Sequence, residues 1–178
     1  ASAMGVPRGF YRAFATHLAS LGQAVLTLDY RGIGTSAARA DTTLADWADL
    51  DLIAAVDLLA QRFEGVQIRF VGHSVGGQLL GLMGDSRIDR ALLVAAQSGH
   101  WRHWHGGWRV RMLFLWYAAI PLVVRLTGRL PAFVLGGGDD IPGGVARQWA
   151  RWGRDVDYIL GFARQRPTSA FETLGAPV

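Results

Sequence analysis

Apolar positions follow two different periods along the first half of the chain. Residues 8–21 and 44–63 carry apolar side chains three and four positions apart, which is the spacing of one helix face. Short, nearly continuous apolar runs at 24–30, 66–71 and 91–96 are typical of strands buried on both faces. Helix and strand therefore alternate. This order predicts an α/β fold with a mostly parallel sheet flanked by helices, and a ligand site at the carboxyl ends of its strands.

The second half of the chain breaks this rhythm and predicts a helical insertion. Residues 98–108 hold three histidines and three tryptophans, residues 112–124 are apolar around Pro121, and residues 145–152 have helical spacing. We expect an α/β core, a helical cap or lid, and a return to the core that starts the next strand, at 1–97, 98–170 and 171–178.

A short glycine-rich motif lies where the second predicted strand gives way to a helix. Residues 72–77 read Gly-His-Ser-Val-Gly-Gly. In a strand-turn-helix context, G-x-S-x-G forces its serine into a strained turn with the hydroxyl above the sheet edge, and Gly72 and Gly76 let strand and helix pack closely. The start of the helix also directs its positive end toward that hydroxyl. The motif predicts Ser74 as a nucleophile and the Val75 N–H as an oxyanion donor.

Composition excludes several classes of site and partner. The 178 residues suit one folded domain, since 51% are hydrophobic and 18% are charged. The chain has no cysteine, which excludes disulfides, thiolate metal sites and a cysteine nucleophile. Its 18 basic residues give a net charge of +4, yet all are arginine and no run of them marks a nucleic-acid surface. Residues 1–6 do not resemble a signal peptide, and we expect a cytoplasmic protein without a nucleic-acid partner.

No histidine completes a triad in the usual order of serine, acid and histidine. His73 belongs to the motif itself, and His17 lies upstream on a predicted helix. Three more follow the third predicted strand: His100, His103 and His105. One of them as base, with Asp139 or Asp140 as its orienting acid, is an alternative with an unusual order.

The three clustered histidines could instead bind a metal ion, because imidazoles this close together can converge on zinc. Arg102 stands among them and no carboxylate is near in the sequence, which disfavours a cation. The surrounding tryptophans favour a lid or pocket wall. We expect neither a metal nor a cofactor.

A second glycine-rich stretch follows the first predicted strand. Gly32-Ile33-Gly34 matches part of a dinucleotide-binding fingerprint, but Ser36 and Ala37 stand where the pattern requires further glycine spacing. A tight turn ordered by Asp29 and Arg31 accounts for the stretch better.

The predicted cap is apolar and basic. Residues 91–138 contain no aspartate or glutamate. The apolar run 112–124 has 13 residues, fewer than the roughly 20 that span a bilayer, so we expect no transmembrane span. A lid packed on the sheet is the favoured interpretation, and peripheral contact with a membrane surface is the other. Five arginines lie around this run: Arg102, Arg109, Arg111, Arg125 and Arg129.

Two motifs together carry a family resemblance. With Asp-Tyr-Arg-Gly-Ile-Gly-Thr-Ser at 29–36 and the motif at 72–77, the chain resembles the α/β-hydrolase superfamily. More narrowly, it is similar to bacterial hydrolases related to serine aminopeptidases and monoacylglycerol lipases. The resemblance implies that Ser74 is the nucleophile, that Val75 gives one oxyanion N–H, and that Met4 gives the second. The usual His-Gly pair of that loop is here Ser2-Ala3.

The resemblance also implies a function and a longer protein. It implies a serine hydrolase that acts on a small-molecule ester or amide through an acyl-enzyme. The chain would be an internal piece, incomplete at both ends, with the acid and histidine of the triad beyond residue 178 and little activity alone. Two alternatives use the same residues: a non-catalytic protein that binds a lipid or partner through its cap, and an acyltransferase.

Overall fold

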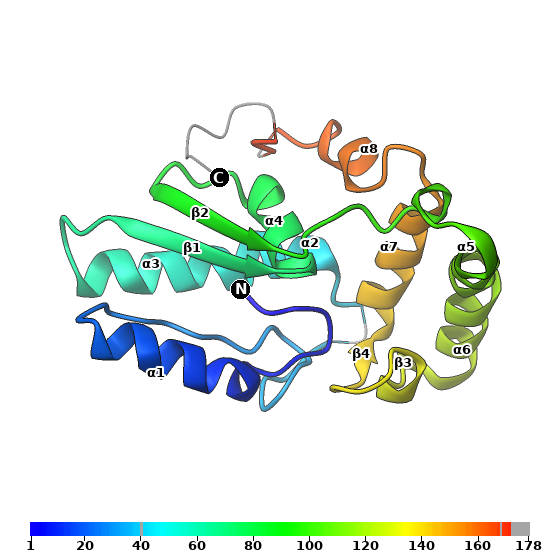
Figure 1. Ribbon diagram of the computed structural model, residues 1–178, viewed down its shortest axis with the longest axis horizontal. Helices are drawn as coiled ribbons and strands as arrows, with labels where there is room; N and C mark the ends of the chain where they lie inside the picture. Colours follow the sequence, from blue (N-terminus) through cyan, green and yellow to red (C-terminus); the bar gives the residue numbers. More distant parts are fainter. Residues whose placement is uncertain (40, 168, 172–178) are drawn as a thin grey trace.

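A computed structural model describes residues 1–39, 41–167 and 169–171. Its sheet contains two parallel strands, β1 (Ile68–His73) and β2 (Ile88–Val94), joined by helix α4 (Val75–Met83). Figure 1 shows helix α3 along one side of these strands, α1 below them, and a group of helices beyond the strands' carboxyl ends. The alternation predicted for residues 66–96 is thus present.

The predicted helices of the first half are found with similar bounds. The first consists of a short turn, η1 (Arg8–Tyr11), and α1 (Arg12–Ser20). The second runs without a break through α2 (Leu44–Asp46), a π-helical stretch η2 (Trp47–Leu52) and α3 (Ile53–Arg62). Thr43 begins it with a capping box, in which the Thr43 hydroxyl accepts from the Asp46 N–H and the Asp46 carboxylate accepts from the Thr43 N–H.

The core lies between α4 and the second helix. Leu79, Leu80 and Leu82 of α4 are buried, as are Leu44, Trp47 and Leu52 opposite them. The Tyr30 ring stacks on Trp47 with ring centroids 4.5 Å apart and planes 7° from parallel. This packing fixes the start of the loop 31–36 against the second helix, since the Trp47 indole N–H also donates to the Arg31 carbonyl.

The strand predicted at 24–30 is wrong in its pairing and its burial. Residues 24–29 pair with no strand in the described part of the chain, and Val25 is 39% exposed. An apolar groove of about 620 Å³ separates them from β1, and the apolar face of α1 lines it too. Strand pairing needs backbones about 4.8 Å apart, and among the described residues β1 pairs with β2 and not with this segment. On this side the backbone of β1 bonds only to Ala1 among the described residues: the Ala1 amine donates to the Val71 carbonyl (2.7 Å), and the His73 N–H donates to the Ala1 carbonyl (3.0 Å).

The second half is helical, as the sequence predicts. After a 3₁₀ turn, η3 (Trp101–His103), helices α5 (Gly106–Phe114), η4 (Leu115–Ala119) and α6 (Ile120–Thr127) form one continuous helix. Helix α7 (Gly143–Arg154) contacts this helix, and α8 (Ile159–Ala163) contacts α4 and α7. Short strands β3 (Arg129–Leu130) and β4 (Ile141–Pro142) pair antiparallel, with a 3₁₀ turn, η5 (Ala132–Val134), between them.

The chain comes back to the core at the end of the described region. The Ala170 N–H donates to the Gly81 carbonyl in α4 (2.8 Å), and the Phe171 ring lies against Gly81. The strand expected from 171 onward falls on residues 172–178, which lie outside the described residues.

Candidate active site

Ser74 occupies the turn between β1 and α4 in a strained backbone conformation. Its φ is 52° and its ψ is −121°, a region that non-glycine residues rarely adopt and that costs roughly 1–3 kcal/mol. Three backbone hydrogen bonds hold it. The Ser74 N–H donates to the Val94 carbonyl at the end of β2 (2.8 Å), while its own carbonyl accepts from Gly77 (3.0 Å) and Gln78 (3.3 Å).

Glycines make this turn sterically feasible. A Cβ on Gly72 would lie 2.5 Å from the Gly77 Cα, and one on Gly76 would lie 2.6 Å from the Ser2 carbonyl oxygen. A Cβ on Gly77 would lie 2.6 Å from the Ala96 Cβ. The close strand-helix packing expected at Gly72 is therefore present, whereas Gly76 packs against the start of the chain at Ala1 and Ser2.

The loop at the start of the chain lies against the first turn of α4. Met4 and Gly5 form the corner of a turn closed by the Val6 N–H and the Ala3 carbonyl (3.1 Å), and Gly5 has a φ of +67°. Val75 is the first residue of α4, so its N–H has no acceptor within the helix. Neither the Met4 nor the Val75 N–H bonds an acceptor in the part of the chain that the structure describes. Both amides are therefore without an acceptor among the described residues.

The family model described as serine aminopeptidase, S33, matches residues 4–130. The chain belongs to this α/β-hydrolase family. The match confirms the resemblance drawn from the two sequence motifs, and it covers the loop at 4–5, both motifs and the continuous helix at 106–127. No curated protein and no solved structure matches the chain.

Tyr11 supports the candidate site of this hydrolase-family chain, and sequence reasoning missed it. Its hydroxyl accepts from the Ala3 N–H (2.9 Å) and lies 2.9 Å from the His73 Nδ1. This hydrogen bond directs the His73 imidazole toward Tyr11, and the tautomer of His73 decides which of the two groups donates. Burial raises the pKa of Tyr11, so the hydroxyl stays protonated. In the sequence, Tyr11 is one more member of the apolar face of 8–21.

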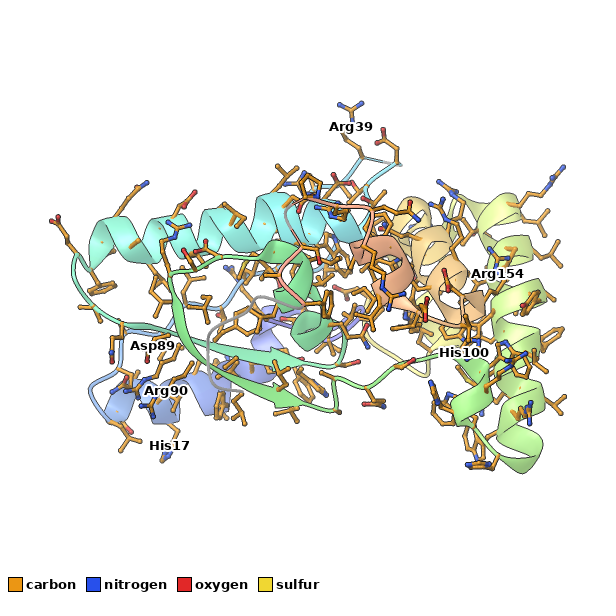
Figure 2. The ribbon with its side chains drawn as sticks, turned by 90° about the horizontal axis from the view of Figure 1, so that it is seen from above. His17, Arg39, Asp89, Arg90, His100 and Arg154 are labelled. Carbon is orange, nitrogen blue, oxygen red and sulfur yellow. The ribbon has the colours of Figure 1, made fainter. Side chains whose placement is uncertain are left out.

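The clustered histidines do not gather into a metal site. His100 is buried, and burial together with the charges of His103 and Arg102 lowers its pKa, which favours the neutral imidazole. His103 and His105 are exposed. No group of three His, Asp or Glu side chains that could hold a metal ion occurs among residues 1–39, 41–167 and 169–171. Figure 2 shows His100 near the group of helices and His17 at the opposite end of the molecule.

The two acids considered as triad partners are engaged elsewhere. The Asp139 carboxylate accepts from the Gly34 N–H (2.6 Å), and the Asp139 N–H donates to the Gly5 carbonyl (2.7 Å). The Asp140 carboxylate accepts from the Ala132 N–H (2.9 Å) and pairs with Arg129 (3.2 Å). Neither carboxylate bonds a histidine within the described region. Asp139 instead links the loop at 4–5 to the loop at 31–36.

The loop at 31–36 is a turn held by charged side chains, as the sequence suggests. The Asp29 carboxylate accepts from the Arg8 N–H (2.6 Å) and lies directly beneath Gly34, where a Cβ would meet it at 2.4 Å. The Arg31 N–H and guanidinium both donate to Asp51 (2.9 and 2.8 Å). These hydrogen bonds hold the loop against other segments of the protein.

Proposed function

We propose that this chain carries the nucleophile and oxyanion hole of a serine hydrolase that cleaves a small-molecule carboxylic ester or amide. The strained conformation of Ser74 between β1 and α4 is the observation that carries the proposal, because it presents a hydroxyl at the start of a helix. Membership in a serine aminopeptidase family supports the reaction class.

In the proposed reaction, the Ser74 Oγ attacks the carbonyl carbon while a base takes its proton. The carbonyl oxygen becomes an oxyanion and receives hydrogen bonds from the Val75 and Met4 N–H groups. Collapse breaks the bond to the leaving alcohol or amine, which takes the proton, and water then cleaves the acyl-Ser74 ester. Each oxyanion donor contributes roughly 3 kcal/mol to the transition state. Among the described residues, no histidine is hydrogen-bonded to the Ser74 Oγ.

The test is covalent labelling of the complete gene product with a fluorophosphonate probe. Ser74→Ala should abolish labelling because the probe needs the attacking Oγ. Ser98→Ala is the matched control, since Ser98 follows β2 and only accepts from the His100 N–H (3.3 Å). Labelling that persists in Ser74→Ala, with the modified peptide elsewhere in the chain, would overturn the assignment.

A further inference from the structure

The continuous helix at Gly106–Thr127, called the outer helix below, is longer than the apolar run that revealed it. It has 22 residues and is long and apolar enough to cross a membrane by length and composition alone. The apolar run 112–124, on which the prediction of no transmembrane span rests, is shorter than this helix. The π-helical stretch η4 precedes Pro121, so the helix continues through a residue that lacks a backbone N–H.

One face of the outer helix is fixed to the protein. Trp116, Ile120 and Val124 are buried on it. The Trp116 ring lies against Gly153 of α7, where a Cβ would stand only 2.4 Å away, and its N–H donates to the Gly99 carbonyl (3.1 Å). In Figure 1 the outer helix lies outside α7, at the edge of the molecule. This anchoring leaves the opposite face toward solvent.

The opposite face is apolar and exposed. Val110, Phe114 and Tyr117 are 66, 64 and 55% exposed, and they recur at the spacing of one helix face. Beside them, Trp108, Leu122 and Leu126 are also more than half exposed. An apolar surface this continuous on a folded protein marks a binding surface.

Cations surround this apolar face. Arg111 lies over the Trp108 ring (4.9 Å), and Arg154 of α7 lies over the Tyr117 ring (5.7 Å). Five arginines of this region have no carboxylate within salt-bridge distance in the described part of the chain: Arg102, Arg109, Arg111, Arg125 and Arg154. Residues 91–138 contain no acidic side chain at all.

From this arrangement we infer that the outer helix docks on the surface of an anionic lipid bilayer. Its exposed apolar face enters the boundary between headgroups and acyl chains, and the arginines bind anionic headgroups. Trp108 and Tyr117 have the amphipathic rings that suit this boundary. The buried face, anchored on α7 through Trp116, keeps the helix parallel to the surface because crossing the bilayer would require that packing to break.

The charge pattern also distinguishes a bilayer from a second copy of the chain. A symmetric dimer through this face would bring the same arginines of both copies together without any acidic partner, and like charges across an interface oppose association. Anionic headgroups neutralise the same charges.

The experiment is flotation of the purified chain with lipid vesicles in about 0.1 M salt, where charges further than about 10 Å apart are screened. Vesicles of phosphatidylcholine with about 30% phosphatidylglycerol should carry the protein, and pure phosphatidylcholine vesicles should carry far less of it. The double variant Arg111→Gln, Arg125→Gln should lower partitioning about 25-fold, at roughly fivefold for each arginine. Phe114→Ser should lower it by at least about tenfold through lost apolar contact.

Matched controls make the same chemical changes away from the outer helix. Arg39→Gln with Arg90→Gln removes two exposed charges, and Figure 2 shows both side chains away from the outer helix. Phe10→Ser removes an equally exposed ring from η1. Both controls should partition within about threefold of the parent chain. Circular dichroism checks that every variant is folded.

Three results would overturn the inference. The first is equal loss of binding in the outer-helix variants and their controls, which would indicate attraction by net charge alone. The second is absence of binding to the anionic vesicles. The third is concentration-dependent dimerisation in ultracentrifugation that Phe114→Ser abolishes, which would make this face an interface between copies.

Discussion

Gly72→Ala tests whether the turn at Ser74 depends on close contact between β1 and α4. The added Cβ would stand 2.5 Å from the Gly77 Cα and 2.7 Å from the Gly77 nitrogen, both backbone atoms of α4. These atoms must retreat by about 0.9 Å before the contact becomes an ordinary van der Waals distance near 3.4 Å. Because helix backbone cannot change rotamer, the whole first turn of α4 has to move.

The expected cost is therefore about 3 kcal/mol, at the upper end for overpacking. For a chain of this size it corresponds to a fall in Tm of roughly 6–12 °C. Thermal unfolding followed by circular dichroism measures it. Gly107→Ala is the control, since a Cβ there meets nothing within 4 Å and replaces glycine in helix α5. That change should be neutral or stabilise by up to about 1 kcal/mol. If Gly72→Ala matched Gly107→Ala within about 0.5 kcal/mol, the packing argument for the turn would be wrong.

Two further changes test local contacts. Thr43→Ala should cost about 1 kcal/mol in the free energy of unfolding, because it removes one half of the capping box, and Thr43→Ser should recover most of that loss. Urea unfolding of both variants checks this, and an unchanged midpoint in Thr43→Ala would contradict it. Asp85→Asn should cost roughly 1–3 kcal/mol at pH 7, because hydrogen bonds from Arg87 to the buried carboxylate hold the pKa of Asp85 below its usual value. That stabilisation is complete above the ordinary aspartate pKa near 4 and is lost as pH falls through the lowered value. Urea midpoints of parent and variant should therefore converge in acid, and a gap that stays constant down to pH about 2 would refute the linkage.

Remote contacts of the turn at Ser74, such as that of Gly76 with Ser2 and that of Gly77 with Ala96, could not be predicted from the sequence. The turn itself could be predicted, because the strand, the glycines and the helix that form it occupy adjacent positions. The same holds for the second helix, whose cap and apolar spacing lie in one stretch of sequence.

The pairing of residues 24–29 could not be predicted in this way. An apolar run indicates that a segment can be buried. A β-strand also needs a second backbone beside it with which to form hydrogen bonds. Residues 24–29 have no such neighbour among the described residues, and a groove lies between this segment and β1. Tyr11 illustrates the same limit, since its hydrogen bonds reach Ala3 and His73, and only the latter is far along the chain.

The helical second half is also part of the candidate site through its backbone. The loop before α7 reaches the chain's first turn, where the Asp139 N–H donates to the Gly5 carbonyl. A Cβ on Gly138 would stand 2.4 Å from that same carbonyl oxygen, so the approach requires glycine. Gly5 follows Met4, the second oxyanion donor of the proposed reaction, and the residues before Met4 are Ser2-Ala3 where the family pattern has His-Gly. The contact from Asp139 therefore supplies support for the position of Met4 that its own sequence neighbourhood lacks.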